Sequence, residues 1–107
     1  MTNETQKKIL DSYLTKRVIL EEVSEGSNVS EATLIGYDDD FAEFKDYVLW
    51  TATIGDLQTP NQFPQTNPRV RLARKVLLKT QIASMQSLDN VLRGRNYQDV
   101  FKLEETQ

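Results

Sequence analysis

The chain of 107 residues contains no cysteine and no histidine. The lack of cysteine excludes disulfides, thiolate metal ligands and cysteine nucleophiles. The lack of histidine excludes imidazole bases and the catalytic triads built on them. Because most common hydrolytic mechanisms have no residues to carry them, we expect a protein that is not an enzyme and that holds no cofactor or metal.

Long hydrophobic runs are also missing. No apolar stretch approaches the roughly 20 residues that a membrane span needs, and residues 1–14 lack the apolar centre of a signal peptide. Charged residues make up 27% of the chain and hydrophobic residues 38%, which is typical of a folded domain. We therefore expect one domain over residues 1–107, with a single compact core, in the cytoplasm and without membrane contact.

The first half of the chain predicts a helix followed by three strands. Residues 5–14 carry apolar side chains at helical spacing, which favours a short amphipathic helix. Residues 18–23, 29–37 and 41–50 are rich in β-branched and aromatic residues and are separated by turn residues, as is typical of strands. Gly36, late in the second of these strands, indicates a sharp bend.

The second half is less regular. Residues 51–68 hold all three prolines and are expected to form either an exposed extension of the third strand or an enlarged irregular loop. Residues 70–81 predict a long strand, although the spacing of their apolar residues also suits a helix. A short last strand is expected at 82–85. A C-terminal extension follows at about 87–107, with a short helix over 87–93.

Three consecutive aspartates, Asp38 to Asp40, separate the second and third predicted strands. Their carboxylates could bind a divalent cation. Aspartate at this position is more often part of a turn in which its side chain accepts hydrogen bonds from the backbone that follows, and we favour that interpretation. The aromatic residues on either side, Tyr37 and Phe41, are expected in the core.

Basic residues gather just after the prolines, although the net charge of the chain is −3. A nucleic-acid-binding protein is more often basic overall, so RNA binding would depend on this local cluster. The cluster could contact phosphates, or it could pair across strands or subunits with the acidic residues Glu21, Glu22, Glu31 and Glu43. Its members are Arg69, Arg71, Arg74, Lys75 and Lys79.

The order of helix, three strands, long loop and two strands resembles the Sm-like family, including its Hfq-type members. Gly36, Tyr37 and Asp38, preceded and followed by apolar residues, look like the first Sm motif. Residues 76–84 look similar to the junction of the fourth and fifth strands in Hfq-type proteins. The resemblance covers about residues 7–88, apart from the enlarged loop.

This resemblance implies a mainly β fold, in which an N-terminal α-helix precedes a strongly bent five-stranded antiparallel barrel. It also implies a cyclic homo-oligomer. A separate physical argument favours such a ring, because pairing the fourth strand of one subunit with the fifth of the next satisfies backbone groups that would otherwise lie unpaired at the strand edges. We expect about five to seven subunits.

The function that the resemblance implies is that of an RNA-binding or RNA-chaperone-like ring that contacts single-stranded RNA. Lys79 matches the lysine of the second motif, whereas Asp40 and Ala42 stand where RNA-binding members carry a base-stacking aromatic residue and an asparagine. We therefore expect an altered binding pocket. The alternative is a structural or protein-interaction ring without RNA binding. The expected RNA contacts are Lys79, Arg69, Arg71, Arg74 and Lys75.

Overall fold

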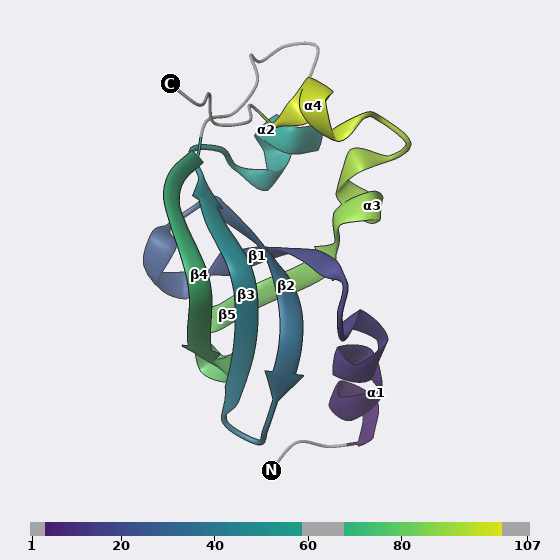
Figure 1. The fold of residues 1–107 in the computed structure, drawn as a ribbon, viewed down its shortest axis with the longest axis vertical. Helices are drawn as coiled ribbons and strands as arrows, with labels where there is room; N and C mark the ends of the chain where they lie inside the picture. The colour runs from purple at the N-terminus through teal and green to yellow at the C-terminus, as the bar shows by residue number, and fades with distance from the viewer. Residues whose placement is uncertain (1–3, 59–67, 102–107) are drawn as a thin grey trace.

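In the described part of the chain, a helix is followed by five strands and several short helices (Figure 1). A computed structural model describes residues 4–58 and 68–101. The elements in chain order are α1 (Glu4–Tyr13), β1 (Arg17–Glu22), the 3-10 helix η1 (Val23–Glu25), β2 (Val29–Tyr37), β3 (Phe41–Trp50), α2 (Ile54–Gln58), β4 (Pro68–Leu78), the 3-10 helix η3 (Lys79–Gln81), β5 (Ile82–Ser87), α3 (Leu88–Leu92) and α4 (Tyr97–Val100). The predicted N-terminal helix and five strands are confirmed. Within the described ranges, no helix is long and apolar enough to cross a membrane.

The five strands form one antiparallel sheet in the order β4-β3-β2-β1-β5. β4 and β5 are the two edges and do not pair with each other, so the predicted five-stranded antiparallel arrangement is confirmed, but the sheet is not closed into a barrel. The reason lies in the connection between them, because the three residues of η3 turn the chain away from β3, and β5 then pairs with β1 instead. Both edge strands consequently present backbone groups that no strand in this sheet pairs with.

Two irregularities bend the central strands. The pairing of β2 with β3 shifts register between Leu34 and Gly36, which confirms the bend predicted at Gly36. A second shift lies near Asp46, whose φ of 51° is in the left-handed region. This kink interrupts the alternation of side chains along β3. Phe44 before the kink and Tyr47 after it therefore both face the core beneath α1, although they are three residues apart.

One hydrophobic core lies on the face of the sheet that α1 covers. Residues Leu10 and Tyr13 of α1 pack against it, together with Leu14. Thr15 then connects α1 to β1 with a φ of 66°, and its amide N donates to the carbonyl of Leu34 at 2.7 Å. The buried members of this first core are Val18, Leu20, Ala32, Leu34, Ala42, Phe44, Tyr47, Leu49 and Leu77.

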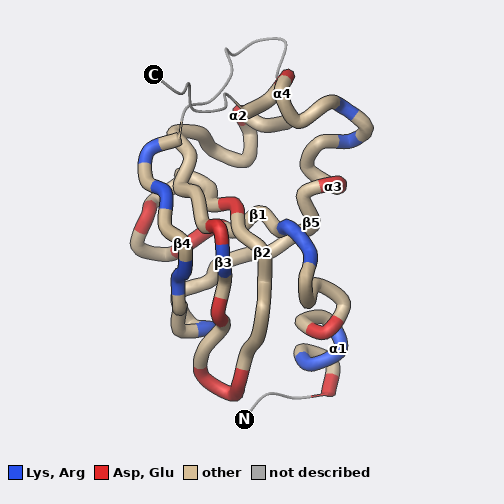
Figure 2. Tube along the Cα trace, viewed as in Figure 1, with Lys and Arg blue, Asp and Glu red and all other residues tan. Residues whose placement is uncertain are grey.

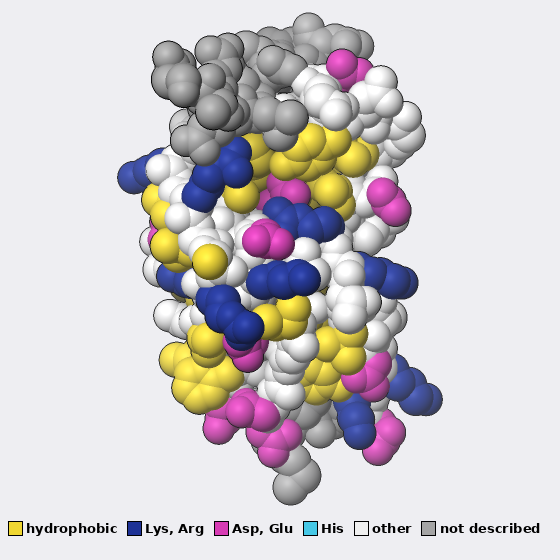
Figure 3. Space-filling view, viewed as in Figure 1, with side chains coloured by type: hydrophobic (Ala, Val, Ile, Leu, Met, Phe, Trp, Pro, Cys, Tyr) yellow, Lys and Arg dark blue, Asp and Glu magenta, His cyan; other side chains and the backbone are white. Residues whose placement is uncertain are grey.

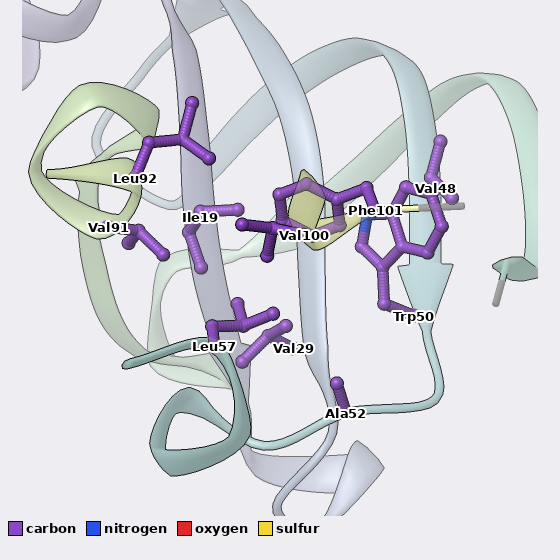
Figure 4. Packing of buried hydrophobic residues seen from close by; sticks show 10 residues of the cluster. All are labelled: Ile19, Val29, Val48, Trp50, Ala52, Leu57, Val91, Leu92, Val100 and Phe101. Carbon is purple, nitrogen blue, oxygen red and sulfur yellow. The ribbon is translucent and has the colours of Figure 1, made fainter. Parts of the chain in front are cut away.

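A second core lies on the opposite face, where α2, α3 and α4 cover the sheet (Figures 1 and 4). Trp50 and Phe101 are fully buried there, with ring centroids 4.7 Å apart. The prediction of a single core was therefore wrong. Successive strand residues point to opposite faces, and β1 to β3 carry apolar residues at both sets of positions. The buried members are Ile19, Val29, Val48, Trp50, Ala52, Leu57, Val91, Leu92, Val100 and Phe101.

Part of the segment predicted to be an irregular loop or a strand extension is helical. α2 begins after Thr53, whose hydroxyl accepts a hydrogen bond from the amide of Asp56 at 3.1 Å. The carboxylate of Asp56 accepts in turn from the amide of Thr53 at 2.9 Å, which completes a reciprocal cap. Residues 59–67 of the predicted loop lie outside the described residues. The core assignment of Phe41 was also wrong, because its side chain at the end of the turn is 43% exposed.

Candidate nucleic-acid interface

A pocket of about 400 Å³ lies between α1 and the segment that joins β4 to β5. Lys79 lines it and is the one member of the predicted RNA-binding cluster that does so. The lining combines hydrophobic residues with polar ones, which suits a ligand that has flat apolar faces and a polar edge. The lining residues are Gln6, Ile9, Leu10, Asp39, Lys79, Thr80, Ile82, Ser84 and Met85.

The acidic turn between β2 and β3 forms one side of this pocket and appears at the lower end of the sheet in Figure 2. Oδ1 of Asp38 accepts hydrogen bonds from the amides of Asp40 and Phe41, both at 2.8 Å. These bonds hold the pKa of the Asp38 carboxyl below its ordinary value, and the bond from the Phe41 amide contributes most. The turn predicted from Asp38 to Asp40 is therefore confirmed.

The position of Lys79 is fixed by its backbone and by a neighbouring ring. Its amide donates to the carbonyl of Asp40 at 2.8 Å, which joins η3 to the acidic turn. Its Nζ lies 5.0 Å from the ring centroid of Tyr37, within the range of a cation–π contact. The Tyr37 hydroxyl donates to the carboxylate of Asp11 on α1, and this bond raises the pKa of Tyr37 to about 12. Tyr37 therefore connects the helix, the turn and Lys79.

The other four predicted RNA contacts lie along β4, away from this pocket. Arg71 pairs with Val48 of the second core, whereas Lys75 pairs with Phe44 of the first core, so these basic residues do not share one face of the sheet. Arg74 forms an ion pair with Glu43, and Nζ of Lys75 lies 5.6 Å from the ring centroid of Tyr47. Figure 3 shows basic side chains over β3 and β4, with hydrophobic side chains between them.

The acidic residues that could have paired with the basic cluster have several different partners. Glu43 does pair with the cluster, through Arg74. Glu31 pairs instead with Arg17, at 2.8 Å between NH2 and Oε2. Glu21 accepts a hydrogen bond from the hydroxyl of Ser84 at 2.5 Å.

Glu31 is the centre of a buried polar site under α4. Its side chain is nearly inaccessible, and Oε1 accepts from Nε1 of Trp50 at 3.0 Å and from the hydroxyl of Tyr97 at 2.7 Å. Oε2 accepts from Nε of Arg17 at 2.9 Å. Burial and the Glu31 carboxylate raise the pKa of Tyr97. A buried carboxylate is tolerated here because each oxygen has a donor, so this site ties α4 to the sheet.

A second buried carboxylate, Glu22, lies in the first core. It accepts hydrogen bonds from the hydroxyls of Ser30 and Tyr47, and these two hydroxyl oxygens are 3.0 Å apart. Burial, followed by the hydrogen bond to Glu22, raises the pKa of Tyr47. Like the Glu31 site, this network is internal, so its role is to hold the bent strands together.

Comparison with models of known protein families and with curated proteins gives no match. The Sm-like resemblance therefore depends on the motif residues and on the arrangement of the strands.

Lys79 was predicted as a contact from the sequence and lines the pocket, but most of the residues around it were not predicted. Gln6, Ile9 and Leu10 lie at the spacing of one helix face, and this could have indicated a shared surface on α1. Ile82 and Met85 of β5 both pack against the first core although they are three residues apart, because the pairing of β5 with β1 shifts register between them. No local pattern indicates that these two surfaces meet, because the pocket forms only when α1 and β5 come together in the fold.

Proposed function

We propose that this protein is an Sm-like subunit of a homo-oligomeric ring that binds single-stranded RNA, with one binding pocket beside Lys79 in each subunit. The observation that carries the proposal is the pocket between α1 and η3, where a cation, hydrophobic residues and hydrogen-bonding groups converge.

The arrangement of the strands supports the ring. β4 and β5 lie at opposite edges of the sheet, so the β4 edge of one copy is free to pair with the β5 edge of the next in the antiparallel sense. Such a contact uses two different surfaces and closes into a ring if the rotation between subunits divides a full turn. Val70, Leu72, Val76 and Leu78 leave hydrophobic area exposed along β4 that a neighbouring subunit would bury.

The chemistry of the pocket supports RNA as the ligand. The ammonium group of Lys79 has three donors and a full positive charge, and it suits a phosphate or a base carbonyl. A volume of about 400 Å³ accommodates a base, and Ile9, Leu10, Ile82 and Met85 provide hydrophobic contact for its faces. Repetition around a ring would turn individually weak contacts into useful affinity, because the second and later contacts are intramolecular.

Fluorescence anisotropy with labelled single-stranded RNA tests this function. We expect the assembled protein to bind at low salt, with affinity falling log-linearly as salt rises, because phosphate contacts release counterions. Lys79→Ala should weaken binding by about tenfold or more, since the contact is lost in every subunit. Lys8→Ala is the matched control. Lys8 is exposed on α1 and does not line the pocket, so this substitution removes the same charge without changing the site.

The contradicting result is equal affinity of the Lys79→Ala and Lys8→Ala variants for RNA. Native mass spectrometry tests the assembly independently, and we expect a single species of about five to seven subunits. A protein that stays monomeric at micromolar concentration would exclude the ring.

A protein-interaction ring without RNA binding is the second candidate. It is favoured by the exposed hydrophobic residues of β4 and by the Arg74–Glu43 pair, which occupies one cation of the predicted cluster with a carboxylate of the same chain. A ring in native mass spectrometry together with no RNA binding at low salt would support this candidate.

A further inference from the structure

The pocket beside Lys79 also contains a carboxylate. Asp39, from the acidic turn, lines it together with Lys79. A carboxylate only accepts hydrogen bonds, and its two oxygens offer about four lone-pair sites, so it can serve a ligand in addition to a partner within the protein. An ammonium group similarly has three donors. The pocket therefore combines an acceptor that has two oxygens with a strong donor.

Ser84 adds a second acceptor. Its hydroxyl donates its single proton to Oε1 of Glu21 at 2.5 Å. With its proton used in this bond, the oxygen of Ser84 can only accept a further hydrogen bond. Gln6 and Thr80 also line the pocket and can each donate or accept, so the charged groups of fixed direction are the donor Lys79 and the acceptor Asp39.

The four bases differ in how well the donors and acceptors on their pairing edges match one strong donor beside a carboxylate. Guanine presents one acceptor, O6, beside two adjacent donors, N1–H and the N2 amino group. A carboxylate can accept both of these donors at once, in the fork geometry that it also uses with arginine. Uracil presents an acceptor on each side of a single donor, so one of its carbonyl oxygens would lie against the carboxylate. Cytosine and adenine each offer the carboxylate one amino group.

We infer that this pocket selects guanine and discriminates against uracil, with Asp39 accepting from N1–H and N2–H while Lys79 donates to O6. The inference rests on the proposed RNA-binding function and specifies the base that the same site recognises. The hydrophobic residues from α1 and β5 contact the faces of the ring, and discrimination between bases comes from the polar edge.

The experiment compares two labelled RNA hexamers, one of alternating uridine and guanosine and one of uridine alone, by anisotropy with the full-length protein. The wild type should bind the guanosine-containing probe about tenfold more tightly, the usual discrimination by a good bidentate contact. Asp39→Asn keeps the shape of the side chain but replaces one acceptor with a donor, which matches the N3–H and O4 of uracil. This variant should lose the preference for guanosine and bind the uridine probe more tightly than the wild type does.

Asp40→Asn is the matched control, since it removes the same charge from the next residue, which does not line the pocket. It should strengthen binding of both probes equally, through the change in charge alone, and retain the preference for guanosine. If the wild type binds both probes equally, or if Asp39→Asn keeps its preference, guanine selection is overturned while RNA binding stands. If neither probe binds at low salt, the proposed function fails, and the inference fails with it.

Discussion

Replacing Tyr97 with phenylalanine tests whether the buried Glu31 site holds α4 on the sheet. The substitution removes one hydroxyl, which donates to Oε1 of Glu31 at 2.7 Å, and leaves the ring beside Phe101, where the two centroids are 4.8 Å apart. The hydrophobic packing of the second core is therefore kept. What changes is the number of donors to a buried carboxylate.

The expected loss follows from the charge of the acceptor. A hydrogen bond to an ionised group contributes about 1.5 to 3 kcal/mol, and the lower end applies because Trp50 and Arg17 still donate to Glu31. We expect the free energy of unfolding to fall by about 1.5 kcal/mol. For a domain of this size, that loss lowers the melting temperature by about 6 to 12 °C.

Urea denaturation followed by circular dichroism measures this loss. Tyr13→Phe is the matched control, because Tyr13 packs against the first core and its hydroxyl has no hydrogen bond among the described contacts. It should change stability by less than about 0.5 kcal/mol. In a double-mutant cycle with Glu31→Gln, the effect of Tyr97→Phe should shrink. A Tyr97→Phe protein as stable as the Tyr13→Phe protein would refute the assigned role of the Glu31 site.

Two further predictions concern stability. Thr15 is a β-branched residue at a φ of 66°, where glycine is less strained. In urea denaturation, Thr15→Gly should raise the free energy of unfolding by about 0.5 to 1 kcal/mol, a figure that already subtracts the greater freedom of glycine in the unfolded chain. Thr15→Ala keeps a Cβ and should raise the free energy of unfolding less. Because the pKa values of Tyr47 and Tyr97 are raised in the folded protein, these residues keep their protons at a pH where the unfolded chain loses them. Their stabilisation is complete below about pH 10, the unfolded value, and is lost as the pH rises above it. The melting temperature should therefore fall above about pH 10, less steeply in Tyr97→Phe, and a fall of equal slope in both proteins would contradict this.

The strands could be predicted from the sequence because their signals are local. The alternation in β2 and β3, the bend at Gly36 and the turn at Asp38 each depend on a few neighbouring residues. The cap at Thr53 and Asp56 was equally local, but the nearby prolines favoured an irregular segment. The predicted barrel was a different kind of expectation, because its shape depends on where β5 pairs, and no short stretch of sequence determines that pairing.

The candidate site was also only partly predictable, because it depends on contacts between segments that are distant in the sequence. Lys79 could be identified from a motif, whereas Asp39 and Ser84 come from a turn and a strand that meet α1 only in the folded chain. The partner of Glu31 was likewise not predictable. The sequence suggested the basic residues of β4, but the register of β1 against β2 pairs Arg17 with Thr33, which brings its guanidinium within reach of Glu31.

α2 belongs to the connection between β3 and β4, and α3 and α4 follow β5, yet they bury one another on the same face of the sheet. Surface connections commonly vary independently between relatives. Here, a relative that lost α2 would uncover part of α3, and one that lost the C-terminal segment would expose Trp50, against which Phe101 packs. The two segments are therefore expected to be gained, lost and exchanged together during evolution, and a graft of one onto another scaffold must include the other.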